Sequence, residues 1–107
     1  MARDAIQQRD GGILDPGTWV HLTTKDGVEY VGRFSGVYQN PRLGWMFYLS
    51  FARPTDGSKP STTIFWRMTD DNGAFASLEN AVQIEKPKTK GGKPIITPLV
   101  PSLSTVH

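Results

Sequence analysis

The chain has 107 residues, with 12 Lys and Arg against 10 Asp and Glu, a formal net charge of +2, and no cysteine. This length fits one small domain with tails, and the absence of cysteine excludes disulfides and thiolate metal ligands. The start of the chain lacks the apolar core of a signal peptide, and no apolar run is long enough for a membrane helix. We therefore expect a cytoplasmic protein, or a virion protein if it comes from a phage, with no membrane partner.

Charge is divided unevenly along the chain. Residues 1–85 carry eight basic and ten acidic side chains, a net of −2, and the remaining +4 comes from Lys86, Lys88, Lys90 and Lys93. The predicted domain is therefore not basic, which argues against nucleic acid as its main partner. The 11 glycines, 8 prolines and many aromatic residues favour a turn-rich all-β fold.

The N-terminal segment, residues 1–14, predicts one short helix over residues 2–9 that ends at Gly11-Gly12. Asp15-Pro16-Gly17 predicts a turn, because proline fixes the φ angle that the second position needs. We expect the main domain to occupy residues 15–86.

The most informative stretch is a predicted hairpin over residues 18–34, with a tight turn at Asp26-Gly27. Apolar and polar residues alternate on both sides of this turn, as in strands with one buried face. The predicted inward residues are Val20, Leu22 and Thr24 in the first strand and Tyr30, Gly32 and Phe34 in the second, with Trp19, His21, Glu29 and Arg33 on the opposite face.

Further strands follow. Asn40-Pro41 and the flanking glycines predict a loop over residues 36–44, and residues 45–52 predict a strand that is apolar on both faces. In that strand Phe47, Leu49 and Phe51 share one face. After a polar connection at residues 53–61, we expect a strand at 62–69, a turn at 70–73, a short strand at 74–77, a 3₁₀ turn at 78–80 and a last strand at 81–85. Five or six short strands favour a closed barrel, which leaves no exposed edge.

Residues 87–107 predict a basic linker and an extended, apolar, Pro-rich C-terminal arm. By composition the lysine- and glycine-rich stretch that begins at Lys86 is a flexible, solvated linker. Proline disfavours a helix in the arm, so we expect an extended segment that docks on its own barrel or on a partner's.

The hairpin resembles the first motif of the Sm-like proteins, which are strongly bent five-stranded barrels of the SH3-like type, in the spacing Val20-x-Leu22-x-Thr24-Lys25-Asp26-Gly27-x-x-Tyr30-x-Gly32-x-Phe34. The resemblance implies such a barrel, with Gly32 at a sharp bend where a β-carbon would obstruct. The RNA-binding residues of that family are not matched, since Tyr38 and then Pro41-Arg42 stand in the loop and Phe75-Ala76 replaces the second motif.

No catalytic, cofactor or metal site is predicted. His21 is the only histidine of the domain and reads as a strand residue on the surface. Asp70-Asp71-Asn72-Gly73 lacks the ligand spacing of a calcium loop and has the composition of a turn. We expect a protein that is not an enzyme.

Exposed aromatic residues with interleaved arginines are the better functional signal, although at least half of these aromatics are expected to complete the core or to lie under the arm. We expect a non-enzymatic protein-interaction and assembly module that forms a homo-oligomer or a larger assembly, as in a phage or bacterial structural or adaptor protein. The alternative is an Sm-like RNA-binding protein that uses Tyr38, Arg42 and Arg67. The predicted partner-binding residues are Trp19, Tyr38, Arg42, Trp45, Phe65, Arg67, Ile95, Ile96, Leu99, Val100 and Leu103.

Overall fold

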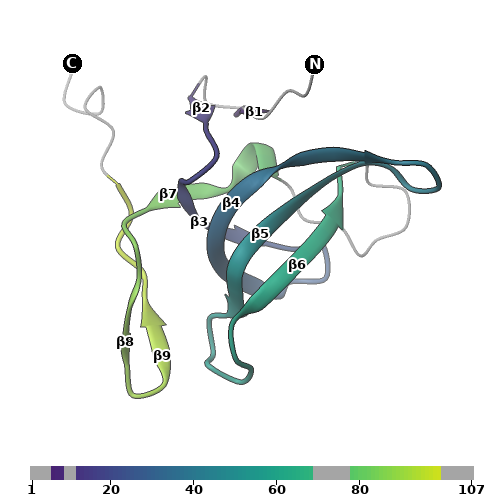
Figure 1. Cartoon of the computed structure of the whole chain (residues 1–107). Coiled ribbons are helices and arrows are strands. Elements are labelled where there is room, and N and C mark those ends of the chain that lie inside the picture. The colour runs from purple at the N-terminus through teal and green to yellow at the C-terminus, as the bar shows by residue number, and fades with distance from the viewer. Residues whose placement is uncertain (1–5, 9–11, 69–77, 100–107) are drawn as a thin grey trace, which may run out of the picture.

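The computed structural model describes residues 6–8, 12–68 and 78–99, and in these the fold is all-β, as predicted (Figure 1). A single turn of 3₁₀ helix, η1 (Leu78–Asn80), lies where the sequence predicts it. The strands are β1 (Ile6–Gln7), β2 (Ile13–Leu14), β3 (Trp19–Thr23), β4 (Glu29–Asn40), β5 (Gly44–Pro54), β6 (Thr62–Arg67), β7 (Val82–Ile84), β8 (Lys88–Lys90) and β9 (Lys93–Ile95).

The main sheet has five antiparallel strands in the order β6-β5-β4-β3-β7, and two small sheets pair β1 with β2 and β8 with β9. The predicted closed barrel is not found. Strands β6 and β7 lie at opposite edges of the main sheet, and no ladder joins them within the described ranges. The predicted turn at residues 70–73 and strand at 74–77 lie outside those ranges.

Strand β4 bends strongly across the sheet (Figure 1), and its pairing with β5 is irregular at Gly32, where the resemblance implies a sharp bend. The register shifts between Val31 and Arg33, where two residues of β5, Phe51 and Ala52, face the single residue Gly32. A β-carbon at Gly32 would lie 2.9 Å from the Cβ of Leu49. Only glycine therefore lets the two strands approach this closely.

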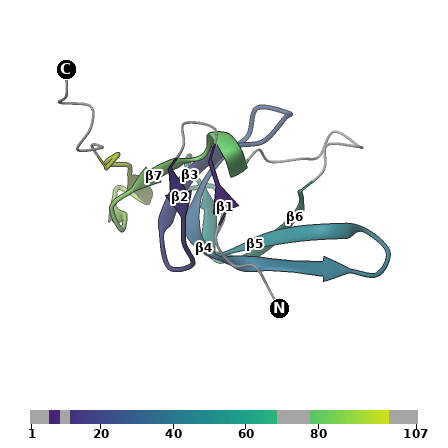
Figure 2. The same ribbon diagram turned by 90° about the horizontal axis from the view of Figure 1, so that it is seen from above.

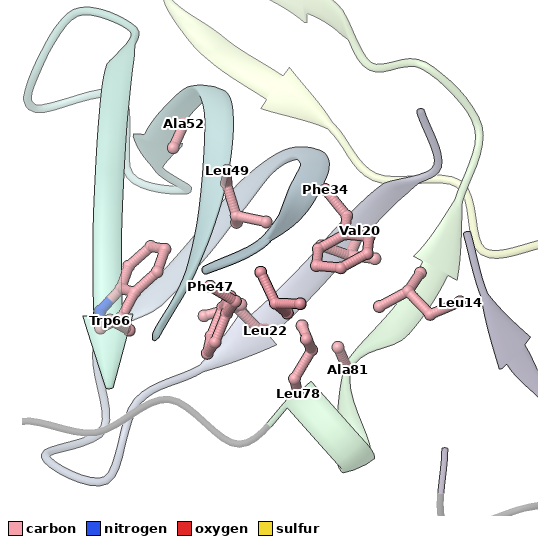
Figure 3. Close-up of a cluster of buried hydrophobic side chains, with 11 residues drawn as sticks. Leu14, Val20, Leu22, Phe34, Phe47, Leu49, Ala52, Trp66, Leu78 and Ala81 are labelled. Atoms are coloured by element: carbon pink, nitrogen blue, oxygen red, sulfur yellow. The ribbon is translucent and has the colours of Figure 1, made fainter. Parts of the chain in front are cut away.

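The core lies on the concave side of this bent sheet (Figure 3). The alternation of β3 is confirmed, because Val20, Leu22 and Thr24 are buried while Trp19 and His21 are only partly so. Phe47 and Trp66 stack with their ring centroids 5.6 Å apart. The core cluster is Leu14, Val20, Leu22, Phe34, Val37, Phe47, Leu49, Ala52, Trp66, Leu78 and Ala81.

The prediction of a loop at residues 36–44 is wrong. β4 continues to Asn40 and pairs with β5 up to Asn40↔Gly44, so the connection is the short turn Pro41-Arg42-Leu43. The Asn40 side chain accepts hydrogen bonds from the backbone N–H groups of Arg42 (2.9 Å) and Leu43 (3.0 Å). Asn-Pro therefore marks a tight turn in a long hairpin, because the flanking residues gain more from pairing across the strands than from an open loop.

The described part of the N-terminal segment is a strand, not the expected helix. β1 pairs with β2, and the backbone N–H of Gln8 donates to Gly12 O at 2.8 Å. The Gln8 side chain is buried and donates to the carbonyl oxygens of Leu78 (3.2 Å) and Ala81 (2.7 Å). These contacts with residues distant in the sequence outweigh the weak local helix propensity.

The lysine-rich linker is likewise ordered as the β8–β9 hairpin. Gly91 and Gly92 have φ angles of 61° and 80° and form its two-residue turn. Beyond the hairpin the chain pairs with the edge of β7, since Glu85 N donates to Thr97 O and Leu99 N donates to Gln83 O, both at 2.9 Å. The arm, as far as Leu99, thus extends its own sheet (Figure 1).

Candidate functional site

The structure distributes the predicted partner-binding residues over four places. Tyr38, Phe65 and Arg67 share the outer face of β4, β5 and β6, opposite the core. Arg42 and Trp45 lie at the tip of the β4–β5 hairpin, and Trp19 lies at the start of β3. Ile95, Ile96 and Leu99 follow the β8–β9 turn, with Ile95 and Leu99 exposed and Ile96 half-buried, while Val100 and Leu103 lie outside the described residues.

Three aromatic side chains form what we call the outer patch: Tyr38, Tyr48 and Phe65. The Tyr48 and Phe65 rings stack with centroids 5.2 Å apart, and Tyr38 meets Phe65 edge to face at 5.7 Å. The Tyr38 hydroxyl donates to Met46 Sδ at 3.3 Å. Phe65 remains 48% exposed, so the outer patch combines fixed rings with accessible apolar surface, which is typical of binding surfaces.

The tip of the β4–β5 hairpin projects beyond the body of the sheet (Figure 2). Leu43 and Trp45 are 41% and 46% exposed there. Alternation along β5 places Trp45 on the same side as Phe47, opposite Tyr48, so Trp45 does not belong to the outer patch. The sequence correctly predicts that Trp45 is exposed, but it does not separate the two faces of the sheet.

Edge strand β6 presents backbone groups on its outer side. Met68 N donates to Trp45 O at 2.9 Å, and alternate residues of an antiparallel strand direct their backbone groups the same way. Ile64 and Trp66 therefore face β5, while the N–H and C=O groups of Thr63 and Phe65 point away from the sheet. No strand of the described ranges pairs with this side of β6, whereas the outer side of β7 is covered by residues 97–99.

A second aromatic pair lies at the other end of the sheet. Trp19 and Phe51 stack with centroids 6.2 Å apart and, with Arg33 and Lys86, line a half-open cavity of about 230 Å³, here called the Trp19 pocket. Phe51 is 58% exposed, although the alternation of β5 predicts it on the same face as Phe47 and Leu49, which are buried. The bulge adds a residue and turns Phe51 outward with a φ of 54°, and no glycine marks this position in the sequence.

Two charged side chains are fixed by local contacts. Hydrogen bonds from the side chain and backbone of Ser58, together with the nearby Lys93 ammonium, hold the pKa of Asp56 below its usual value. His21 Nε2 lies 2.8 Å from Glu29 Oε1 on the exposed face of β3 and β4. Neither contact assembles a set of reactive groups, and no group of three or more potential metal ligands occurs among the residues the structure describes.

Helices long and apolar enough to cross a membrane do not occur in the described part of the chain. Comparisons with protein-family models, with curated proteins and with solved structures find no match for this sequence. Two aromatic surfaces and one sheet edge that no described strand pairs with are the features of this chain that bear on its function.

Proposed function

We propose that this protein is a non-enzymatic assembly module, built on an open relative of the SH3/Sm-like barrel, that self-associates by pairing strand β6 with β6 of a second copy. Five antiparallel strands and the bend at Gly32 support the barrel relationship. The observation that carries the proposal is the asymmetry of the two sheet edges: the chain covers β7 with its own residues 97–99 and leaves the outer side of β6 open within the described ranges.

The composition of β6 supports pairing. Its sequence, Thr-Thr-Ile-Phe-Trp-Arg, consists largely of residues that favour strands, and it lacks the proline or lysine that often protects a free edge. An antiparallel pair centred on Ile64 would place Thr63 of one copy opposite Phe65 of the other, so that their outward N–H and C=O groups bond each other. A twofold axis of this kind makes the contact self-complementary and joins the outer patches of both copies.

RNA binding through Tyr38, Arg42 and Arg67 receives less support. Tyr38 and Arg67 share the outer face, but Arg42 lies at the hairpin tip, past the end of the ladder. One arginine beside three aromatic rings offers few cations for phosphate groups, which dominate the affinity of most RNA complexes.

Removal of the outward backbone N–H of Thr63 in the full-length chain tests this proposal. We expect Thr63→Pro to reduce the particle mass in light scattering to that of one chain, 11.8 kDa, because proline removes a donor from the free side and leaves the bonds to β5 intact. Thr63→Val keeps the N–H and should keep the wild-type mass. A wild-type protein that scatters as a single chain at all concentrations would overturn the proposal, as would a Thr63→Pro protein of unchanged mass.

A further inference from the structure

The backbone of Phe51 has an energetically unfavourable conformation. Its φ of 54° lies in the left-handed region, where a bulky side chain is rare and strained, and more than half of its surface is exposed. Glycine would adopt this bulge conformation without strain and would expose no aromatic ring. The Phe51 side chain belongs neither to the core cluster nor to the outer patch, and its ring stacks on Trp19 at the surface.

What the ring does contribute is one wall of the Trp19 pocket. Phe51 and Trp19 offer aromatic surface, and Arg33 and Lys86 add two positive charges. No carboxylate of the described residues forms an ion pair with either cation. The guanidinium of Arg33 lies beside the turn at Gly17, 3.7 Å from where a β-carbon of that residue would be.

Size limits what fits. The cavity of about 230 Å³ is smaller than the roughly 300 Å³ at which pockets for drug-sized molecules begin, so it encloses one ring system, and the rest of a larger ligand would lie outside its open side. Stacking on an exposed phenyl face favours a flat ring, and two neighbouring cations favour a negative charge on it.

We propose that the Trp19 pocket binds a small aromatic anion: a flat ring that stacks on Phe51 and bears, directly or through a linking group, a carboxylate or phosphate held by Arg33 and Lys86. Two kinds of molecule have this chemistry, the aromatic carboxylates and the mononucleotides. The sequence predicts Trp19 and Arg33 on one face of a single hairpin, and the structure pairs them directly. The bulge of β5 and the path of the chain after β7 bring Phe51 and Lys86 to the same place.

Calorimetric titration of the full-length protein with matched probes tests the proposal. Benzoate is compared with benzyl alcohol, which lacks the charge, and with cyclohexanecarboxylate, which lacks the flat ring. Adenosine monophosphate is compared with adenosine and with ribose 5-phosphate in the same way. We expect saturable binding of benzoate, of adenosine monophosphate or of both, and binding roughly tenfold weaker for each probe that lacks the ring or the charge. The better of the two complete probes identifies the kind of ligand.

Variants distinguish a loss of ligand binding from a loss of folding stability. Phe51→Gly should weaken binding of the complete probe roughly tenfold and change the urea midpoint little, because relief of the left-handed backbone strain offsets the loss of the Trp19 stack. Lys86→Gln, at an exposed position, should weaken the anionic probe and leave its uncharged partner unaffected. Phe65→Leu, in the outer patch, is the matched control and should bind as wild type.

Three results would each overturn the proposal: no saturable binding of either complete probe, equal binding of benzoate and cyclohexanecarboxylate, or unchanged binding in both Phe51→Gly and Lys86→Gln. None of these results depends on the oligomeric state, so the test is independent of the pairing proposed for β6.

Discussion

At the scale of single residues, Gly32 and Phe51 together make one β-bulge between β4 and β5. The absence of a side chain at Gly32 lets β4 and β5 approach, and the extra residue opposite it is accommodated by turning Phe51 into the left-handed region. The sequence indicates the first half through the resemblance of the hairpin to the Sm-like motif, which implies a sharp bend at Gly32. It does not indicate the second half, since nothing in the pattern of β5 distinguishes Phe51 from a core residue.

We predict that Gly32→Ala destabilises the protein by roughly 1–3 kcal/mol, because its β-carbon would press against Leu49 Cβ and the backbone of Ala52, at 2.9 and 3.1 Å. Urea denaturation measures this change. Gly44→Asn is the control, since Gly44 has a φ of 80° that asparagine tolerates and no atom within 4 Å of its β-carbon position. Equal urea midpoints for Gly32→Ala and wild type would show that the strands can move apart at no cost.

At the scale of elements, the β8–β9 hairpin is fixed at its turn. Arg53 donates a hydrogen bond to Gly92 O, and Gly57, in the loop between β5 and β6, lies against the same carbonyl. A basic stretch that reads as a linker by composition is therefore held against the main sheet at its glycine turn. Composition describes how a segment behaves alone, whereas this hairpin depends on a partner about 40 residues earlier in the chain.

Gly57→Asn tests this contact. Asparagine tolerates the φ of 75° at this position, but its β-carbon would lie 2.4 Å from Gly92 O. We expect faster amide hydrogen exchange in β8 and β9, and unchanged exchange in β3 and β4, because the hairpin loses its anchor while the main sheet keeps its pairing. Gly27→Asn, with a φ of 89° and no neighbour within 4 Å, should leave the exchange of β8 and β9 as in wild type. Unchanged protection in Gly57→Asn would contradict the anchoring role.

At the scale of the whole molecule, the two edges of the main sheet differ in whether another segment of the chain pairs with them. Residues 97–99 cover β7, so this part of the C-terminal arm acts within its own chain, while β6 is open in the described ranges. Assembly through the arm of a neighbour would require that these backbone bonds be exchanged between copies. Assembly through β6 requires no such exchange, which is why we favour it.

Deletion of residues 97–107 distinguishes the two routes. We expect a loss of roughly 1–3 kcal/mol in unfolding free energy, from two backbone hydrogen bonds at about 0.5–1.5 kcal/mol each, and a greater tendency to aggregate through the newly exposed β7. Chemical denaturation and light scattering measure both effects. A smaller particle of unchanged stability would instead mean that the arm joins one copy to the next.

The sequence by itself determines the strand class, the turns at Asp15–Gly17 and Asp26-Gly27, and the inward face of β3. All of these depend on neighbours a few residues away, through alternation and backbone conformation. For the candidate sites the sequence identifies Tyr38, Phe65 and Trp19, because large aromatic side chains can be recognised from residue type alone. It does not identify Phe51 or Lys86, and it does not place Trp45 on a different face from Tyr38.

Only the tertiary structure decides that the sheet stays open between β6 and β7 in the described residues, that the arm covers β7, and that Phe51 and Lys86 join Trp19 and Arg33 in the Trp19 pocket. These features depend on register and on pairing between segments far apart in the chain. One inserted residue at a bulge reverses the face of a side chain, and a pairing partner tens of residues away leaves no mark on local periodicity.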